Sequence, residues 1–318
     1  MSVATTLRAA LPGEAPAGFG EHTRAAPRGV LILANPYSGV LSNRAHVAEL
    51  GSALASQGLR PRPVWQLEEL DALATQSDLA EEYRCLVAAG GDGTLNRAIN
   101  HQLRVPLAVF PLGNENLFAR HFAFTNNPQR LAEAIARGKL RPIDLGRSAG
   151  RLFSIVASGG FDGEVARRLA QWREQHTHLR RVGHHSYIRP ILASLTEYQF
   201  PPMEIEIDDR PPIEGALAMV FNIPTYALGL QLCPDATADD GHLDWIVFKR
   251  PGLWHLGRYA LATLLRQQRR LGDVFWGRAR RVRLRCTTPV PLEIDGDQAG
   301  FAPLEIEVMP AATQVVVM

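Results

Sequence analysis

The chain has 318 residues, of which 46% are hydrophobic and 21% are charged, a composition typical of a globular protein with two domains. Its 34 Lys and Arg residues nearly balance its 32 Asp and Glu residues, so no overall positive field indicates a nucleic-acid partner. Three scattered cysteines without CxxC or CxxH spacing exclude a zinc motif of that kind and a disulfide framework. No run approaches the roughly 18 apolar residues of a membrane span, so we expect a cytoplasmic protein.

The chain divides by pattern into three parts. Residues 1–27 are rich in Ala, Gly and Pro and lack the apolar stretch of a signal peptide, so we expect a disordered or loosely attached leader. A second change of pattern occurs near residue 146. We therefore expect one domain over residues 28–146 and another over residues 147–318.

Between residues 28 and 146, strand and helix patterns alternate. Strands are expected at "GVLILANP" (29–36), "RPRPVWQL" (60–67), "CLVAA" (85–89) and "PLAVFPL" (106–112), and helices at 42–59, 68–84, 95–103 and 127–140. Ser42 is the expected cap of the first helix, and Gly58 its end. This alternation is typical of parallel βαβ units.

Beyond residue 146 the stretches are short, β-rich and closely spaced, and one helical region at about 163–198 interrupts them. We therefore predict an α/β protein with two domains. The first is a Rossmann-like α/β domain, and the second is a mostly antiparallel β-sandwich with an inserted helical region.

A glycine loop, "GGDGT" (90–94), follows a buried strand and precedes a helix. Glycine lets another group approach the main chain closely, and N–H groups at a helix N-terminus bind phosphate oxygens. Asp92 is expected to orient the loop, a metal or a hydroxyl. The alternative is a tight turn that ends the strand, but the succession of strand, loop and helix favours a phosphate site.

Two other loops have the same setting. "PLGNENLFAR" (111–120) supplies Asn114 and Asn116, and "NPYSG" (35–39) precedes the first helix. In a parallel sheet these loops emerge at the carboxyl edge, where ligands bind, so three of them together predict a nucleotide site. For the asparagines, the alternative is a polar loop with a helix cap.

Acidic residues gather in two later segments. "PDATADDGHLD" (234–244) places four carboxylates in eleven residues, which suits Mg²⁺ or Ca²⁺, although an acidic turn explains the composition equally well. "EIDGDQAG" (293–300) contains Asp295 and Asp297 around a glycine, which by itself predicts a hairpin turn.

Two basic segments give only weak indications of a binding site. Four histidines at 176, 178, 184 and 185 fall on different helix faces, which argues against a metal site. The Arg- and Trp-containing run at 266–285 is suited to anionic lipid headgroups, but a solvated face is the favoured interpretation.

Taken in order, "NPYSG", "GGDGTLN", "PLGNENLFAR", "SGGFDGEV", "PDATADDGHLD" and "EIDGD" form a recognisable series. From about Gly29 onward, the chain resembles the diacylglycerol kinase catalytic-domain family, in particular bacterial soluble lipid kinases related to diacylglycerol, sphingosine and ceramide kinases. The glycine-aspartate loop is shared with other kinases, whereas the complete series is far more specific.

The resemblance implies a role for individual residues. ATP phosphates would be held by residues of the three loops: Asn35, Ser38, Gly39, Gly90, Gly91, Asp92, Gly93, Thr94, Asn96 and Asn114. Asn114 stands where the family has a threonine. The family's aspartate at the start of the next helix is replaced by Leu117.

The resemblance also implies a metal site and a general base. A structural Mg²⁺ would be bound by the carboxylate of Asp240 and the backbone carbonyls of Thr237 and His242. The general base would be Asp297, where the family has glutamate. Aspartate carries the same carboxylate group as glutamate, and the intrinsic pKa values of the two are similar.

We therefore expect an ATP- and Mg²⁺-dependent lipid kinase that phosphorylates diacylglycerol or a related lipid. The lipid would be reached at a membrane surface, with peripheral association as an open possibility, and a homodimer also stays open. The alternatives are an NAD kinase or phosphofructokinase-like small-molecule kinase, which share the glycine loop, and a catalytically silent nucleotide- or lipid-binding protein.

Overall fold

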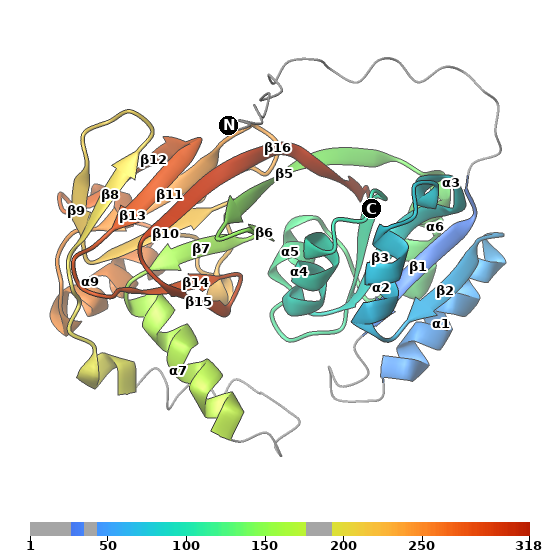
Figure 1. Ribbon diagram of the computed structural model, residues 1–318, viewed down its shortest axis with the longest axis horizontal. Helices are drawn as coiled ribbons and strands as arrows, with labels where there is room; N and C mark the ends of the chain where they lie inside the picture. Colours follow the sequence, from blue (N-terminus) through green and yellow to red (C-terminus); the bar gives the residue numbers. More distant parts are fainter. Residues whose placement is uncertain (1–26, 35–42, 176–192) are drawn as a thin grey trace, which may run out of the picture.

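The computed structural model describes residues 27–34, 43–175 and 193–318 (Figure 1). An α/β body and a β-rich body lie side by side, and two strands run between them (Figure 1). Several expectations fall on residues outside the described ranges: the leader apart from Pro27, the loop at 35–39, Ser42 and the four histidines.

Four parallel strands form the sheet of the α/β body, in the order β2-β1-β3-β4. The strands are β1 (Gly29–Ala34), β2 (Arg60–Val64), β3 (Tyr83–Gly90) and β4 (Leu107–Pro111). Its helices are α1 (Asn43–Ser56), α2 (Leu67–Ala74), α3 (Leu79–Glu82), α4 (Asp92–Asn100), α5 (Leu117–His121) and α6 (Pro128–Arg137). β1 is buried along its whole length, as expected for a central strand of a parallel sheet that helices cover.

Local capping signals place both ends of α6 and the end of α1. The side chain of Asn127 accepts a 3.0 Å hydrogen bond from the backbone N–H of Arg130, which starts α6, and Gly138 ends it with φ of 69°. Gly58, with φ of 74°, follows α1 as predicted. The single helix expected over 68–84 is wrong, because the polar segment "TQSD" interrupts it and the buried Tyr83 already belongs to β3.

The β-rich body contains two facing layers of strands. One layer has the order β12-β11-β10-β7-β14-β15 and comprises β7 (Val156–Gly159), β10 (Leu217–Phe221), β11 (Leu243–Phe248), β12 (Val274–Ala279), β14 (Pro291–Ile294) and β15 (Asp297–Phe301). The other comprises β5 (Leu140–Ser148), β6 (Arg151–Phe153), β8 (Met203–Ile207), β9 (Ile213–Gly215), β13 (Arg281–Arg285) and β16 (Leu304–Val316). Every strand pair within these layers is antiparallel.

A common apolar core lies between the two layers. It includes Ile294 and Trp245 from one layer and Leu284 and Ile306 from the other. These side chains come from alternate positions of their strands, as burial on one face of a sheet requires. The predicted fold class, an α/β domain followed by an antiparallel β-sandwich, is therefore confirmed.

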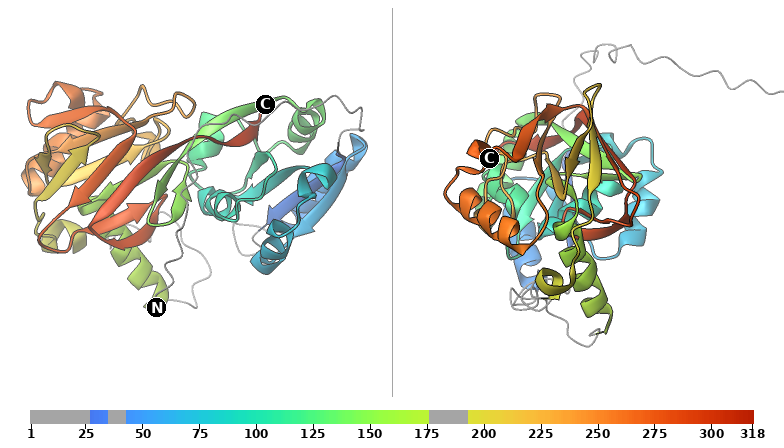
Figure 2. Two further views of the ribbon diagram at one scale, coloured as in Figure 1. Left: turned by 45° about the horizontal axis from the view of Figure 1, so that its top comes forward. Right: turned by 90° about the vertical axis from the view of Figure 1, so that its left-hand side faces the viewer.

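β5 and β16 join the two bodies. They pair with each other along most of their length, and Figure 2 shows them running side by side from one body to the other. β16 pairs with β13 near Ile306 and with β4 at Val315. The change of pattern noted near residue 146 therefore falls within a strand that both bodies share.

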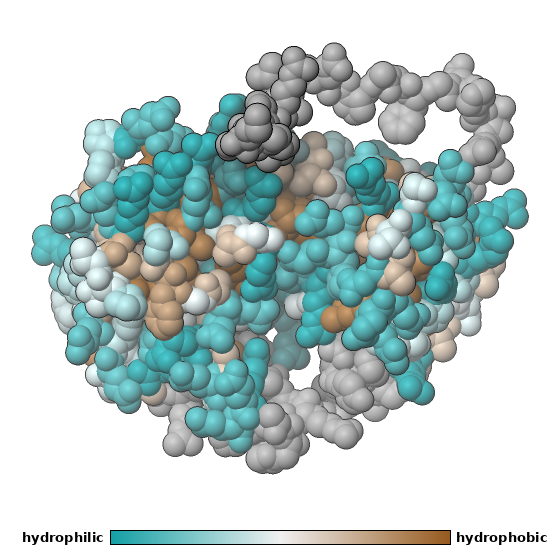
Figure 3. Space-filling view, viewed as in Figure 1, coloured by the Kyte–Doolittle hydropathy of each residue, from teal (hydrophilic) through white to brown (hydrophobic). Residues whose placement is uncertain are grey.

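The remaining helices lie in the β-rich body. α7 (Phe161–Gln175) occupies part of the helical region expected at 163–198, and α9 (Leu253–Leu264) follows β11. Short 3₁₀ turns are η1 (Ala227–Gly229) and η2 (Gln268–Arg270). Among the described residues, no helix combines the length and the apolar character needed to cross a bilayer. Figure 3 shows a mainly hydrophilic face that is interrupted by patches of apolar residues.

Candidate active site

The two glycine loops of the α/β body touch each other. They leave the paired strands β3 and β4 at the same edge, where Gly90 pairs with Pro111. A Cβ atom on Gly113 would lie only 2.5 Å from the Cα atom of Gly91. Neither position can carry a side chain without moving the other loop. The expectation that these loops meet at the carboxyl edge of the sheet is therefore confirmed.

Asp92 holds the second loop in place. Its carboxylate accepts hydrogen bonds from the backbone N–H groups of Leu117 (3.0 Å) and Phe118 (3.2 Å), which begin α5. Burial raises the pKa of this carboxyl group, and the two N–H donors act in the opposite direction. Of the roles expected for Asp92, orientation of the loop is the one seen in this structure.

The asparagines of the second loop behave differently from each other. Asn116 folds back onto Gly113, accepting from its N–H at 3.1 Å and donating to its carbonyl at 2.7 Å. It therefore does not cap α5 with its side chain, because Asp92 takes that role. Asn114 is exposed and available to a ligand.

The residues of the first loop divide into packed and open positions. A Cβ on Gly90 would meet the hydroxyl oxygen of Thr94 at 2.2 Å, and Thr94 itself is buried. Gly93 is different, because a Cβ there would meet no atom within 4 Å. Gly93 lies in the first turn of α4, where backbone N–H groups lack partners within the helix. This open first turn is the part of the loop that fits a phosphate group.

A side chain of α4 connects the glycine loop to the other body. Asn96 donates to the carboxylate of Asp295 at 3.2 Å, and its own carbonyl oxygen accepts from Asn100 at 3.0 Å. Asn100 in turn hydrogen-bonds the backbone of Leu152, at the start of the β-sandwich. Asn96 is buried and committed to these contacts, so its place is between the bodies rather than in the open first turn.

The "DGD" segment is a hairpin turn, as its sequence predicts. Asp295 and Gly296 have φ values of 48° and 86° and connect β14 to β15 as a two-residue loop. The buried carboxylate of Asp295 accepts from the backbone N–H groups of Ser154, Ile155 and Val156 at 2.9–3.0 Å. Burial raises its pKa to about 6, against the effect of these donors.

Asp297 lies on the other side of this turn. Its side chain is 54% exposed, and one carboxylate oxygen lies 3.7 Å from a guanidinium nitrogen of Arg151. Asp295 and Asp297 therefore differ, one held by backbone N–H groups and the other open to solvent. The cause is the turn and not strand alternation, because Asp295 and Gly296 have positive φ values. Asp297 is the carboxylate of this turn that can reach a substrate.

Next to the turn lies a second group of carboxyl side chains. The hydroxyl oxygen of Ser158 is 2.8 Å from a carboxylate oxygen of Asp162 and 2.9 Å from one of Glu293. Asp162 also accepts from the Tyr226 hydroxyl, and Glu293 from the N–H of Gly296. A hydroxyl has one hydrogen to donate, so both contacts of Ser158 are hydrogen bonds only if one carboxyl group is protonated.

Of the two carboxyl groups, Glu293 is the one whose surroundings favour the protonated form. It is buried, and burial together with the nearby charge of Asp162 raises its pKa well above the ordinary value. The protonated acid then donates to Ser158, and Ser158 donates to Asp162.

The acidic loop at 234–244 is occupied by arginines. One oxygen of Asp240 accepts from the backbone N–H of His242 at 3.0 Å, and the other lies 3.2 Å from Arg278. Two other acids of the loop face Arg141 and Arg269 in the same way. A cation bound to Asp240 would have to displace the guanidinium group of Arg278. As arranged, these side chains fit arginine rather than Mg²⁺, and the ligand set of Thr237, Asp240 and His242 stays a prediction.

Among the described residues, no group of three or more His, Cys, Asp or Glu side chains is arranged to hold a metal ion. The loop residues Asn35, Ser38 and Gly39 lie outside the described ranges, so their contribution also stays a prediction. The described parts of the site are thus the glycine loop with Gly93, the exposed Asn114, and the turn that carries Asp297.

Comparison with known families covers both bodies. The model "Diacylglycerol kinase catalytic domain" matches residues 29–148, and "YegS C-terminal NAD kinase beta sandwich-like domain" matches residues 155–317. The chain belongs to the diacylglycerol kinase family. A diacylglycerol kinase of Bacillus subtilis (strain 168) is 27% identical over 86% of this chain and 91% of its own length. One of Mycobacterium tuberculosis (strain CDC 1551 / Oshkosh) is 30% identical over 90% and 94%.

The fold of this diacylglycerol kinase family member also matches solved structures. A crystal structure described as a diacylglycerol kinase from Bacillus anthracis str. Sterne aligns with a TM-score of 0.67, covering 93% of this chain and 98% of the other. Sequence identity in that alignment is 20%, so this likeness concerns the fold. The family assignment made from the motif series is confirmed.

Two contacts near the candidate site of this family member are not predicted from the sequence. The first involves Glu293 in "PLEI", where a glutamate in an otherwise apolar strand is a signal for a buried polar partner. The link from Asn96 to Asp295 has no local signal, because it depends on how the two bodies meet.

Proposed function

We propose that the protein is an ATP-dependent lipid kinase that transfers the γ-phosphoryl group of ATP to a hydroxyl group of diacylglycerol or a related lipid. One observation supports this most strongly. The hydrogen bond from Asn96 to Asp295 puts the phosphate-binding loop beside the turn that carries Asp297. The proposed phosphate site of the α/β body therefore lies on the same side of the junction as the exposed carboxylate of the β-rich body. Phosphoryl transfer needs the two bound substrates to be held close together in this way.

The donor side of the site rests on the first turn of α4. Gly93 leaves open space there, and the partial positive charge of the helix N-terminus favours phosphate oxygens. Asn114 on the adjoining loop supplies a further hydrogen-bonding side chain. Mg²⁺ is proposed to bind with the ATP phosphates, where it would spread the charge that develops during transfer.

The acceptor side rests on Asp297. The lipid hydroxyl oxygen forms a bond to the γ-phosphorus atom while the bond from that atom to the bridging oxygen of ADP breaks. The hydroxyl proton passes to the carboxylate of Asp297. A guanidinium nitrogen of Arg151 lies 3.7 Å from this carboxylate. We propose a membrane surface as the source of the lipid and a cytoplasmic location for the protein.

The decisive experiment is a transfer assay with radiolabelled ATP. The purified protein is incubated with MgCl₂ and mixed micelles that contain diacylglycerol, sphingosine or ceramide, and labelled products are identified by mass spectrometry. A labelled lipid that disappears with the Asp297→Asn variant supports the proposal. Labelled NADP⁺ or sugar phosphate from parallel reactions with NAD⁺ or fructose 6-phosphate, and no labelled lipid, would overturn it. ATP binding without any transfer would assign the protein to a silent class.

A further inference from the structure

One side of α9 exposes a row of large apolar side chains. Trp254 is 80% exposed, Leu261 58%, Leu264 67% and Leu265 61%. Their spacing places them along one stripe of the helix. Exposed single leucines are ordinary in proteins, but four large apolar residues on one helix face mark a surface that contacts something else.

The opposite side of α9 is already anchored to the protein. Tyr259 is buried, its ring lies 4.7 Å from that of Phe248, and its hydroxyl donates to Asp273 at 2.9 Å. Ala262 and Thr263 are buried on the same side. The exposed stripe is therefore additional to the packing that holds the helix, and Figures 1 and 2 show α9 on the outside of the β-rich body.

Several cationic residues flank this stripe. Lys249 and Arg250 come just before α9, Arg258 lies on it, and Arg266 and Arg270 follow it, while Asp273 is the one acidic residue of the segment 249–273. Arg250 and Arg258 share this single carboxylate. Arg266 and Arg270, which follow the helix, are exposed and have no ion-pair partner among the described residues.

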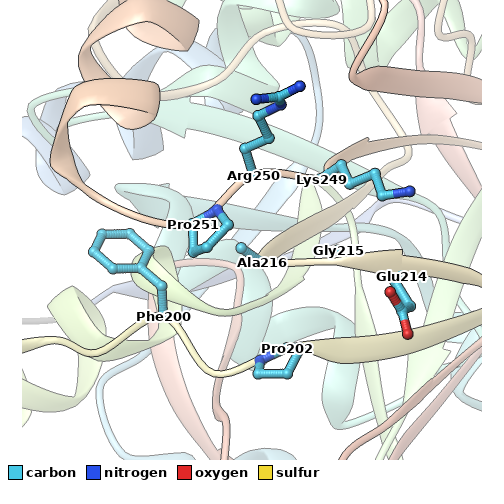
Figure 4. Close-up of a pocket in the computed structure, with 8 residues that line it drawn as sticks. All are labelled: Phe200, Pro202, Glu214, Gly215, Ala216, Lys249, Arg250 and Pro251. Atoms are coloured by element: carbon cyan, nitrogen blue, oxygen red, sulfur yellow. The ribbon is translucent and has the colours of Figure 1, made fainter.

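The apolar and basic character continues beyond the start of α9. A hollow of about 330 Å³ lies there, with Phe200 and Pro251 on one side (Figure 4). Pro251 leads directly into the helix, and Lys249 and Arg250 extend from the rim (Figure 4). The lining of the hollow also includes one acidic residue, Glu214.

We propose that α9 docks this protein onto the surface of an anionic membrane. The apolar stripe enters the boundary between headgroups and acyl chains, and the surrounding Lys and Arg side chains contact lipid phosphates. A tryptophan in such a stripe suits the interface because its ring is apolar and its N–H stays wet. The inference rests on the proposed function, because it names the surface through which the kinase reaches its lipid.

Charge complementarity selects this occupant over a second copy of the chain. In a two-fold dimer through α9, the arginine-rich rim would face an identical arginine-rich rim and repel it. Anionic headgroups supply the opposite charge over the whole area. For the run at 266–285 a solvated face is the interpretation favoured by the sequence. The proposal gives Arg266 and Arg270, at its start, a role beside this helix, whereas the arginines of β13 at its end pair with Glu206 and Glu305 in the other layer.

Vesicle binding tests the proposal without ATP or a lipid substrate. Cosedimentation is measured with vesicles of phosphatidylcholine alone and with vesicles containing 30% phosphatidylglycerol. We expect at least tenfold stronger partitioning into the anionic vesicles, weakened by 0.5 M NaCl. The Leu261→Glu, Leu265→Glu double variant should partition into the anionic vesicles at least tenfold more weakly than the parent. A matched control, Arg137→Ala with Lys139→Ala on the α/β body, makes the same change in net charge and should retain binding within twofold.

Three further measurements complete the test. Thermal unfolding must show that both double variants keep the parent melting temperature within a few degrees, and a Leu261→Ser, Leu265→Ser variant replaces the glutamates if they do not. The fluorescence emission of Trp254 is obtained by subtracting the spectrum of Trp254→Phe from that of the parent. This emission should shift to shorter wavelength when vesicles are added. Equal vesicle affinity of parent and stripe variants would overturn the proposal. So would a dimer in sedimentation velocity that the stripe variant dissociates. If vesicle binding succeeds while lipid transfer fails, the docking surface stands and the kinase proposal falls.

Discussion

The side-chain amide of Asn96 donates a 3.2 Å hydrogen bond to the carboxylate of Asp295, across the junction of the two bodies. Asn96 belongs to the helix that follows the glycine loop, and Asp295 belongs to the turn that presents Asp297. This bond therefore fixes the distance between the proposed phosphate donor site and the proposed base. The three backbone N–H groups that also bind Asp295 tie the same turn to the start of β7.

Removing this link should affect catalysis more than nucleotide binding. Asn96→Ala removes one donor to the Asp295 carboxylate, which keeps the N–H of Ser154 on the same oxygen, and the loss of such a hydrogen bond costs about 1–3 kcal/mol of unfolding free energy. We expect kcat for lipid phosphorylation to fall while the Kd for ATP changes less than twofold. Urea unfolding and ATP titration check the two parts. A loss of ATP affinity equal to the loss of kcat would contradict a role between the bodies.

The glycine loop offers a pair of matched variants. Gly93→Ala fills open space in a helix and should raise stability by up to about 1 kcal/mol, since alanine is the better helix former. If phosphate occupies that space, ATP affinity should still fall at least tenfold. Gly91→Ala should instead lower stability, because its Cβ would lie 3.2 Å from the Cα of Gly113. Gly93→Ala with parent ATP affinity would remove the first turn of α4 from the phosphate site.

Glu293 gives a prediction about pH. Its carboxyl pKa is raised in the folded protein above the unfolded value of about 4.3, mainly by burial and then by Asp162. A raised carboxyl pKa contributes stability that is complete below about pH 4.3 and is lost as pH rises through the folded value. Glutamine reproduces the protonated acid, donating to Ser158 and accepting from Gly296. The free energy of unfolding of Glu293→Gln, measured with urea, should equal that of the parent at pH 4. At pH 8 it should be higher than that of the parent by more than about 1 kcal/mol. A variant that is less stable at pH 8 would show an ionised Glu293.

The proposed base is tested by two substitutions at one position. Asp297→Asn keeps the shape of the side chain and removes its basicity, so kcat should fall by about 10²–10⁴ with nearly unchanged ATP affinity. Asp297→Glu should retain activity or raise it. Asp209→Asn, at an exposed carboxylate in the turn between β8 and β9, is the control and should have no effect. Parent turnover by Asp297→Asn on the identified lipid would assign the base to another group.

The acidic loop is tested by thermal unfolding with and without Mg²⁺. Because Arg278 lies against Asp240, Asp240→Asn should lower the free energy of unfolding by about 1 kcal/mol in EDTA. MgCl₂ alone should leave the melting temperature of the parent protein unchanged. A rise in melting temperature with Mg²⁺ in the parent, absent in Asp240→Asn, would instead establish the cation site that the family resemblance implies.

Local chemistry explains why much of the site could be predicted from the sequence. The strand, glycine and helix signals around Gly90 and Gly113 lie within short segments, and parallel strands bring such loops to one edge by geometry alone. The "DGD" turn is equally local, because Gly296 and the residue before it adopt the positive φ values of a two-residue hairpin.

The contacts that were missed all join distant segments. Asp92 caps a helix that begins at Leu117, on the next loop, and no pattern around either residue indicates the pairing. Asn96 and Asp295 meet only because the two bodies dock. The prediction of one helix over 68–84 is wrong for another reason. The apolar spacing on both sides of "TQSD" fits a continuous helix, although these polar residues favour a turn.

The strand β16 has a consequence for biosynthesis. Val315 pairs with Leu107 of β4, so the edge of the parallel sheet beside β4 is completed by residues that the ribosome makes long after the rest of that sheet. Until they emerge, the nascent α/β body carries an unpaired strand edge that is open to association with other chains. The last strand of the chain therefore has to be made before the sheet edge beside β4 gains its partner at Val315.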